Sequence, residues 1–205
     1  MPRRLMAILR GLRPGQATSV GECLVNRGFG IIEVPLNSPD PFTSISILAR
    51  EFGSEAVVGA GTVLTVEEVR RAAECGSQII VSPNTDPAVI AETRRLGLQS
   101  WPGAFTPTEC FIALGAGADG IKLFPAGLAG PAGAAALRTV LPPGVVIHAV
   151  GGVSPDQFAE WLANGVDGFG IGSHLFADGM SIGDIDRRAE IIVETYDLAV
   201  KGRRN

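Results

Sequence analysis

Short apolar runs recur along the whole chain, and the stretches between them repeat apolar residues with a helical period. The apolar runs cover residues 6–9, 30–35, 57–62, 79–82, 99–102, 120–124, 145–150 and 168–172. Their spacing of roughly 20–27 residues is that of a strand followed by a helix. The pattern therefore predicts eight strands, each leading into a helix.

The stretches between the runs carry start and stop signals of helices. Capping boxes pair a Ser or Thr with a Glu or Gln three residues later: Thr65 with Glu68, Thr106 with Glu109, Ser154 with Gln157. A proline at the first helical position follows Thr106, Ser154 and also Asp86, which is a similar start. Gly76, Gly97 and Gly165 are expected to end helices.

Eight such units without an evident linker predict a single (β/α)₈ barrel, of the TIM-barrel type, that spans residues 1–205. An open, doubly wound sheet is the structural alternative. It is weakened because Gly28 and Gly30 do not continue into a GxGxxG turn that opens a helix. In a barrel, functional side chains gather at the carboxyl ends of the strands.

Lys122 stands in the apolar run 120–124 and is one of only two lysines, against fifteen arginines. A desolvated amine has a lowered pKa, so more of it is the neutral nucleophile that attacks a carbonyl carbon and forms a Schiff base. A guanidinium cannot do this. The alternative is a strand-end lysine that extends to water, and the run alone does not decide between the two.

Glu33 is a carboxylate among apolar neighbours in the run 30–35. A buried charge needs a reason: we expect a general acid/base, and the alternative is a structural pair with Arg10. Arg10, just after the first run, is expected to bind a substrate anion. Its alternatives are the pair with Glu33 or a plain surface position.

Small residues close three other predicted strands. Thr62, after Gly59-Ala60-Gly61, offers a hydroxyl to a substrate carboxylate, although such glycines also serve close packing. Gly151, Gly152, Gly172 and Ser173 follow the seventh and eighth runs, where barrels commonly bind phosphate through backbone N–H groups. The alternative for these four is a pair of tight turns.

Composition limits the remaining possibilities. The net charge is −4, and basic pairs occur only as Arg3-Arg4, Arg70-Arg71, Arg94-Arg95, Arg187-Arg188 and Arg203-Arg204. Without a basic cluster we expect no nucleic-acid partner, and we expect the terminal pairs to be solvated tails. The three cysteines and the two histidines, His148 and His174, lack metal-ligand spacing. No run has the length of a membrane span or signal peptide, so we expect a cytoplasmic protein.

Taken together, the motifs resemble the family of 2-keto-3-deoxy-6-phosphogluconate and 6-phosphogalactonate aldolases. The segments that carry the resemblance are Glu33-Val34-Pro35-Leu36-Asn37-Ser38, Gly59-Ala60-Gly61-Thr62-Val63-Leu64, Ser82-Pro83-Asn84, Pro102-Gly103 with Thr106, Lys122-Leu123-Phe124-Pro125-Ala126 and Val150-Gly151-Gly152-Val153. Asn37 and Val150 stand where the gluconate-type enzymes have arginine and threonine. These departures resemble the phosphogalactonate enzymes.

The resemblance implies a class I aldolase of galactonate catabolism, with Lys122 as Schiff-base lysine and Glu33 as acid/base. It implies a small 2-keto acid sugar phosphate as substrate, no cofactor or metal, no membrane partner and a homotrimer. Three alternatives remain open: a phosphogluconate aldolase, a non-covalent sugar-phosphate isomerase with Glu33 as base, and a non-catalytic barrel that binds a phosphate ligand.

Overall fold

The computed structural model describes residues 3–203, without the side chain of Arg203. Met1, Pro2, Arg204 and Asn205, which belong to the expected domain, lie outside the described residues. The strands are β1 (Leu5–Ile8), β2 (Ile31–Pro35), β3 (Val57–Gly61), β4 (Ile79–Val81), β5 (Gln99–Trp101), β6 (Gly103–Ala104), β7 (Ile121–Leu123), β8 (Ile147–Val150) and β9 (Gly168–Ile171). The helices are α1 (Pro14–Asn26), α2 (Pro41–Phe52), α3 (Val66–Glu74), α4 (Pro87–Arg95), α5 (Pro107–Gly115), α6 (Ala126–Val140), α7 (Phe158–Ala163) and α8 (Ile182–Arg203), with a 3₁₀ turn at Pro155–Gln157.

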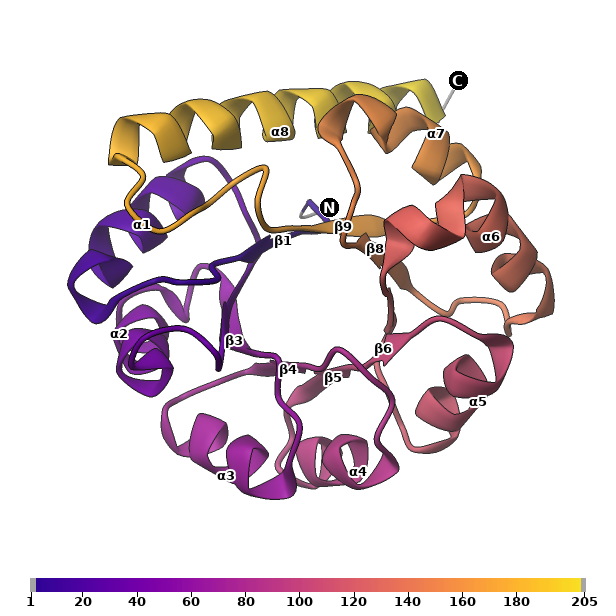
Figure 1. Cartoon of the computed structure of the whole chain (residues 1–205), viewed down its shortest axis with the longest axis horizontal. Coiled ribbons are helices and arrows are strands. Elements are labelled where there is room, and N and C mark those ends of the chain that lie inside the picture. The colour runs from indigo at the N-terminus through magenta and orange to yellow at the C-terminus, as the bar shows by residue number, and fades with distance from the viewer. Residues whose placement is uncertain (1–2, 204–205) are drawn as a thin grey trace.

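All strand pairs are parallel, and the sheet bends into a ring surrounded by helices (Figure 1). The strand order is β5-β4-β3-β2-β1-β9-β8-β7-β6. Its two ends, β5 and β6, are separated only by Pro102, whose carbonyl accepts a hydrogen bond from the Lys122 amide at 3.0 Å. The predicted barrel is confirmed, and the open sheet is excluded. The fifth predicted strand, residues 99–102, ends at Trp101, and a further short strand, β6, follows Pro102, because proline has no N–H to donate to the ladder.

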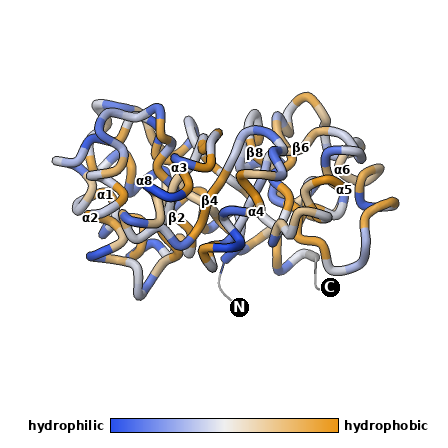
Figure 2. Tube along the Cα trace, turned by 90° about the horizontal axis from the view of Figure 1, so that it is seen from below, coloured by the Kyte–Doolittle hydropathy of each residue, from blue (hydrophilic) through white to orange (hydrophobic). Residues whose placement is uncertain are grey.

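Two hydrophobic clusters follow from the alternation of side chains along the strands. The larger one fills the space between strands and helices. The smaller one lies inside the barrel and consists of Met6, Ile8, Ile79, Val81, Trp101 and Val150. The side view in Figure 2 shows hydrophobic and hydrophilic segments alternating along the surrounding helices, as expected of helices that bury one face.

The helix signals in the sequence are confirmed. Thr65 and Thr106 form complete capping boxes with Glu68 and Glu109, and Asp86 accepts the amide hydrogen of Ala88 at 2.8 Å. The third capping box, Ser154 with Gln157, starts the 3₁₀ turn rather than an α-helix. Gly76, Gly97 and Gly165 all have positive φ, as residues that end helices commonly do.

One expectation for the chain ends is wrong. Arg3 is not a solvated tail, because its guanidinium makes two hydrogen bonds of 2.8 Å to Asp197 of α8. Arg4 is exposed but is not a solvated tail either, because its guanidinium lies 3.4 Å from the Asp167 carboxylate and its amide donates to the Tyr196 hydroxyl at 3.1 Å. Among the described residues, no helix has both the length and the apolar character that crossing a membrane requires.

Candidate active site

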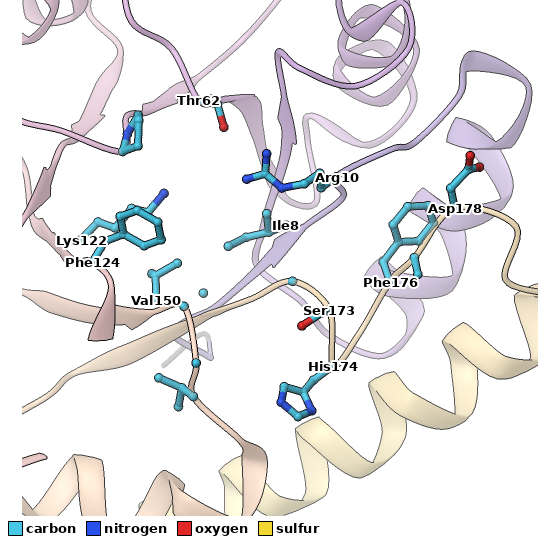
Figure 3. Close-up of a pocket in the computed structure, with 17 residues that line it drawn as sticks. Ile8, Arg10, Thr62, Lys122, Phe124, Val150, Ser173, His174, Phe176 and Asp178 are labelled. Atoms are coloured by element: carbon cyan, nitrogen blue, oxygen red, sulfur yellow. The ribbon is translucent and has the colours of Figure 1, made fainter. Parts of the chain in front are cut away.

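A cavity of about 450 Å³ opens at the carboxyl ends of the strands. Its walls include seven of the eight residues predicted to bind or transform a ligand: Arg10, Thr62, Lys122, Gly151, Gly152, Gly172 and Ser173. They come from five of the strands or the loops that follow them (Figure 3). The eighth residue, Glu33, is buried and does not line the cavity, but its carboxylate lies against Gly61, the neighbour of Thr62.

Lys122 is the middle residue of β7 and is 6% exposed. Figure 3 shows its side chain directed into the cavity, and its Nζ lies 4.9 Å from the centre of the Phe124 ring. Burial lowers the pKa of the amine, the nearby Glu33 carboxylate raises it, and Arg10 lowers it again. Because burial is the largest of these effects, Lys122 has a larger neutral fraction than an ordinary lysine.

Glu33 lies in the middle of β2 and is 1% exposed. Its Oε2 has no hydrogen-bond partner among the described residues. The carboxylate rests against Gly61 of β3, where a Cβ atom would collide with both oxygens. Burial raises its pKa to about 7, although Lys122 and Arg10 both act to lower it. A group with such a pKa exchanges protons readily near neutral pH.

No hydrogen bond or ion pair joins Arg10 to Glu33 among the described residues, although the charge of Arg10 lowers the pKa of the Glu33 carboxyl group. The exposed guanidinium of Arg10 points into the cavity and donates a 2.7 Å hydrogen bond from Nη1 to Oδ1 of Asn37. Thr62 also lines the cavity, on the same side as Arg10 in Figure 3, and has a φ of 56°. Positive φ is costly for a β-branched residue and is concentrated at functional sites. Arg10 and Thr62 thus form one polar wall above the Lys122 amine.

The glycine loops form another wall. Gly151 and Gly152 follow β8 with φ values of 84° and 76°. The backbone N–H groups of Gly152, Val153, Ser173 and His174 line this wall and donate to none of the described residues. Unpaired amides are rare in proteins unless water or a ligand accepts from them. Together with the Ser173 hydroxyl they offer several donors to one anion, as phosphate sites do.

Several lining residues were not predicted from the sequence. Phe124 faces the cavity because it stands two positions after Lys122, so the alternation along a strand could have identified it. Asp178 also lines the cavity, and it forms a 2.8 Å ion pair with Arg13. The two residues are far apart in the sequence, so no local pattern could have predicted this contact. Of the two histidines, His174 lies at the rim and His148 is buried below the cavity.

The described part of the chain contains no group of three or more His, Cys, Asp or Glu side chains suited to hold a metal ion. The site instead combines an amine with a lowered pKa, a carboxylate with a raised pKa, a free cation and a ring of amide donors. Such a site suits a ligand with a carbonyl group in its middle and an anion at each end.

Comparisons with known proteins agree with this arrangement. The family model for KDPG and KHG aldolase matches residues 2–191. A probable 2-dehydro-3-deoxy-6-phosphogalactonate aldolase of Rhizobium meliloti is 48% identical, covering 100% of this chain and 96% of its own. A 2-dehydro-3-deoxy-6-phosphogalactonate aldolase of Escherichia coli is 41% identical over 96% of both chains. A solved structure described as native KDPGal is 40% identical over 98% of both chains, with a TM-score of 0.96. The chain belongs to the KDPG and KHG aldolase family.

Proposed function

We propose that this chain is a class I aldolase that cleaves 2-keto-3-deoxy-6-phosphogalactonate, also called 2-dehydro-3-deoxy-6-phosphogalactonate, to pyruvate and glyceraldehyde 3-phosphate. The observation that carries the proposal is the Lys122 amine, which is buried, interacts electrostatically with Glu33 and lines a cavity that also holds Arg10 and the glycine loops. The two relatives that span nearly the whole chain bear the name of this activity. Galactonate catabolism is the pathway that this substrate implies.

Catalysis begins when neutral Lys122 attacks the C2 carbonyl carbon. The carbinolamine that forms loses water and becomes a protonated imine, an electron sink next to the bond that must break. Glu33, directly or through one water, moves the protons of this dehydration. Its pKa of about 7 lets the same group donate and then accept.

Carbon–carbon cleavage then needs a base at the C4 hydroxyl. Glu33 accepts the hydroxyl proton, the C3–C4 bond breaks, and its electron pair moves into the iminium to give an enamine and the aldehyde. Glu33 returns the proton to C3, and water releases pyruvate from Lys122. The protonated form of Glu33 is stable in its buried position, because burial opposes the charge.

The two polar walls support a proposed orientation of the substrate. Thr62 and Arg10 receive the carboxylate, and the amides around Gly152 and Ser173 receive the phosphate. Binding of the remote phosphate orients the scissile bond and thereby contributes to the rate. Val150 lines the cavity between Lys122 and the phosphate wall, so it presents an apolar surface near the C4 hydroxyl.

The test compares cleavage of the phosphogalactonate and phosphogluconate substrates, which differ at C4. We expect a higher kcat/KM for the galactonate form, and a preference for the gluconate form would contradict the assignment. A non-covalent isomerase or a binding barrel is separated by incubation with pyruvate and borohydride, because only an imine is reduced to a stable adduct. Absence of the adduct would favour one of those alternatives.

We also propose that the protein is a cytoplasmic homotrimer. Self-association is supported by a solved structure, 39% identical over this whole chain with a TM-score of 0.98, that is described as a cage made by fusing symmetric oligomeric domains. Light scattering on the purified protein should give three times the chain mass of 21.3 kDa. A monomeric mass would contradict the trimer.

A further inference from the structure

Asn37 is the one described side chain that contacts the Arg10 guanidinium through a hydrogen bond. The bond runs from Nη1 to the amide oxygen over 2.7 Å and joins the loop after β1 to the loop after β2. Arg10 is exposed and carries a long, flexible side chain, so without a partner its guanidinium would sample many positions. The contact with Asn37 restricts it to the side of the cavity that faces Lys122.

The next residue pair in the same loops strengthens this contact. The Gly11 amide donates a 3.0 Å hydrogen bond to Oγ of Ser38, which is 7% exposed. Gly11 has a φ of 93°, a conformation that glycine adopts without strain. Two adjacent residues of one loop thus bond to two adjacent residues of the other. The backbone that carries Asn37 is therefore fixed relative to the backbone that carries Arg10.

The chemistry of the contact matters as much as its position. An amide oxygen is neutral, so it holds the guanidinium without cancelling its charge. The remaining N–H groups of Arg10 stay available, and a guanidinium binds a carboxylate best through two parallel hydrogen bonds. An aspartate in place of Asn37 would hold Arg10 equally well but would occupy it as an ion pair.

We propose that Asn37 is a positioning residue that orients Arg10 toward the carboxylate of the 2-keto acid while leaving the guanidinium charge unpaired. The inference rests on the proposed function, because it needs a 2-keto acid bound to Lys122. It adds to that function a reason for an amide, rather than a carboxylate or an apolar side chain, at position 37.

The test measures the pyruvate concentration that gives half-maximal borohydride trapping, which requires neither phosphate binding nor carbon–carbon cleavage. Asn37→Ala should raise this concentration about tenfold, the effect of a lost hydrogen bond to a charged group. Asn37→Asp should raise it at least as much, because the new carboxylate competes with pyruvate for Arg10. In an Arg10→Ala background both changes should have no further effect.

Asn164→Ala is the matched control, since it removes an amide that bonds to the Glu160 carbonyl at 2.9 Å in α7, away from the cavity. It should trap pyruvate like the unaltered protein. If Asn37 only maintained the loop fold, Asn37→Asp would keep the hydrogen bond and behave normally, and that result overturns the inference. If Asn37→Ala leaves the pyruvate concentration for half-maximal trapping unchanged, the positioning role of Asn37 is also overturned, but the aldolase assignment is not. No trapping by the unaltered protein overturns both.

Discussion

Two buried ionisable sites lie inside the same barrel and differ in almost every chemical respect. His148 is 1% exposed, its ring lies 4.3 Å from the ring of Trp101, and its Nδ1 has no partner among the described residues. Burial lowers the pKa of His148 to about 3, with Arg4 acting in the same direction. The histidine therefore stays neutral, and it is shielded from solvent and does not line the cavity.

Lys122 and Glu33 are buried to a similar degree, but each lies near an opposite charge and close to the cavity. Their mutual attraction offsets part of the cost of burial, so a proton can move between protein and ligand near neutral pH. Burial alone therefore perturbs a pKa without creating a catalyst. Access to the ligand and a complementary charge are also needed.

The largest effect is expected for Lys122→Arg. The cation and much of the side-chain volume survive, but a guanidinium cannot form the imine, so turnover should fall by about 10³-fold or more. Steady-state cleavage measures the loss, and circular dichroism checks that the barrel is intact. Activity near that of the unaltered protein would mean that Lys122 contributes only a positive charge and is not the nucleophile.

Glu33→Gln should lower turnover by about 10²–10⁴-fold, as expected for a lost general acid/base. The amide is similar in shape to the carboxyl group, so the fold should remain. Exchange of the pyruvate methyl protons in deuterated water, followed by NMR, should slow as well, since it needs the same base. An unchanged rate of proton exchange would mean that Glu33, like His148, is a structural residue and not a base.

Gly152→Val should reduce cleavage of the phosphorylated substrate by about 10-fold or more while affecting pyruvate proton exchange much less. A Cβ at this position would meet Gly127 at 3.2 Å, and the φ of 76° disfavours a branched residue. Because this variant carries a risk to folding, Ser173→Ala serves as a milder second change that should alter KM in the same selective way. Equal loss of both activities in both variants would place the phosphate elsewhere.

The pH profile should distinguish the two buried sites directly. A base must be deprotonated to act, and Glu33 has a pKa of about 7, so kcat/KM should fall about tenfold per unit as the pH drops below 7. Glu33→Gln should lose the part of this fall that the carboxyl group causes and keep only the part caused by protonation of Lys122. His148→Leu should retain the whole fall, and a fall that disappeared with the histidine would reverse the assignment.

The smallest effect is expected for His148→Leu itself. The side chains have similar volumes and the substitution removes an unpaired buried nitrogen, so the free energy of unfolding should change by less than about 1.5 kcal/mol. Urea denaturation measures this change, and kcat should stay within about threefold. A severe loss of turnover with normal stability would give His148 a part in catalysis.

Much of this fold is encoded locally and could be predicted. Thr65, Thr106 and Asp86 cap their helices through hydrogen bonds to residues two or three positions away, so the sequence alone contains the signal. The break at Pro102, where β5 ends and β6 follows, was missed, although proline's missing N–H was visible in the sequence.

The site could be predicted only where a residue conflicts with its local surroundings. Lys122 and Glu33 are conspicuous as charges within apolar strands, whereas Asn37 and Asp178 are ordinary loop residues. Their partners, Arg10 and Arg13, are 27 and 165 positions away, and the pairing of β1 with β2 and with β9 brings them together.

The most direct test of the account is peptide mapping of the protein after borohydride reduction in the presence of pyruvate. Modification of Lys122 blocks tryptic cleavage there, so the added mass should appear on a joined peptide covering residues 96–138. Lys201, the other lysine, is exposed at the end of α8 and should remain unmodified. An adduct on the joined peptide covering residues 189–203, which contains Lys201, or no adduct at all, would contradict the proposed imine chemistry.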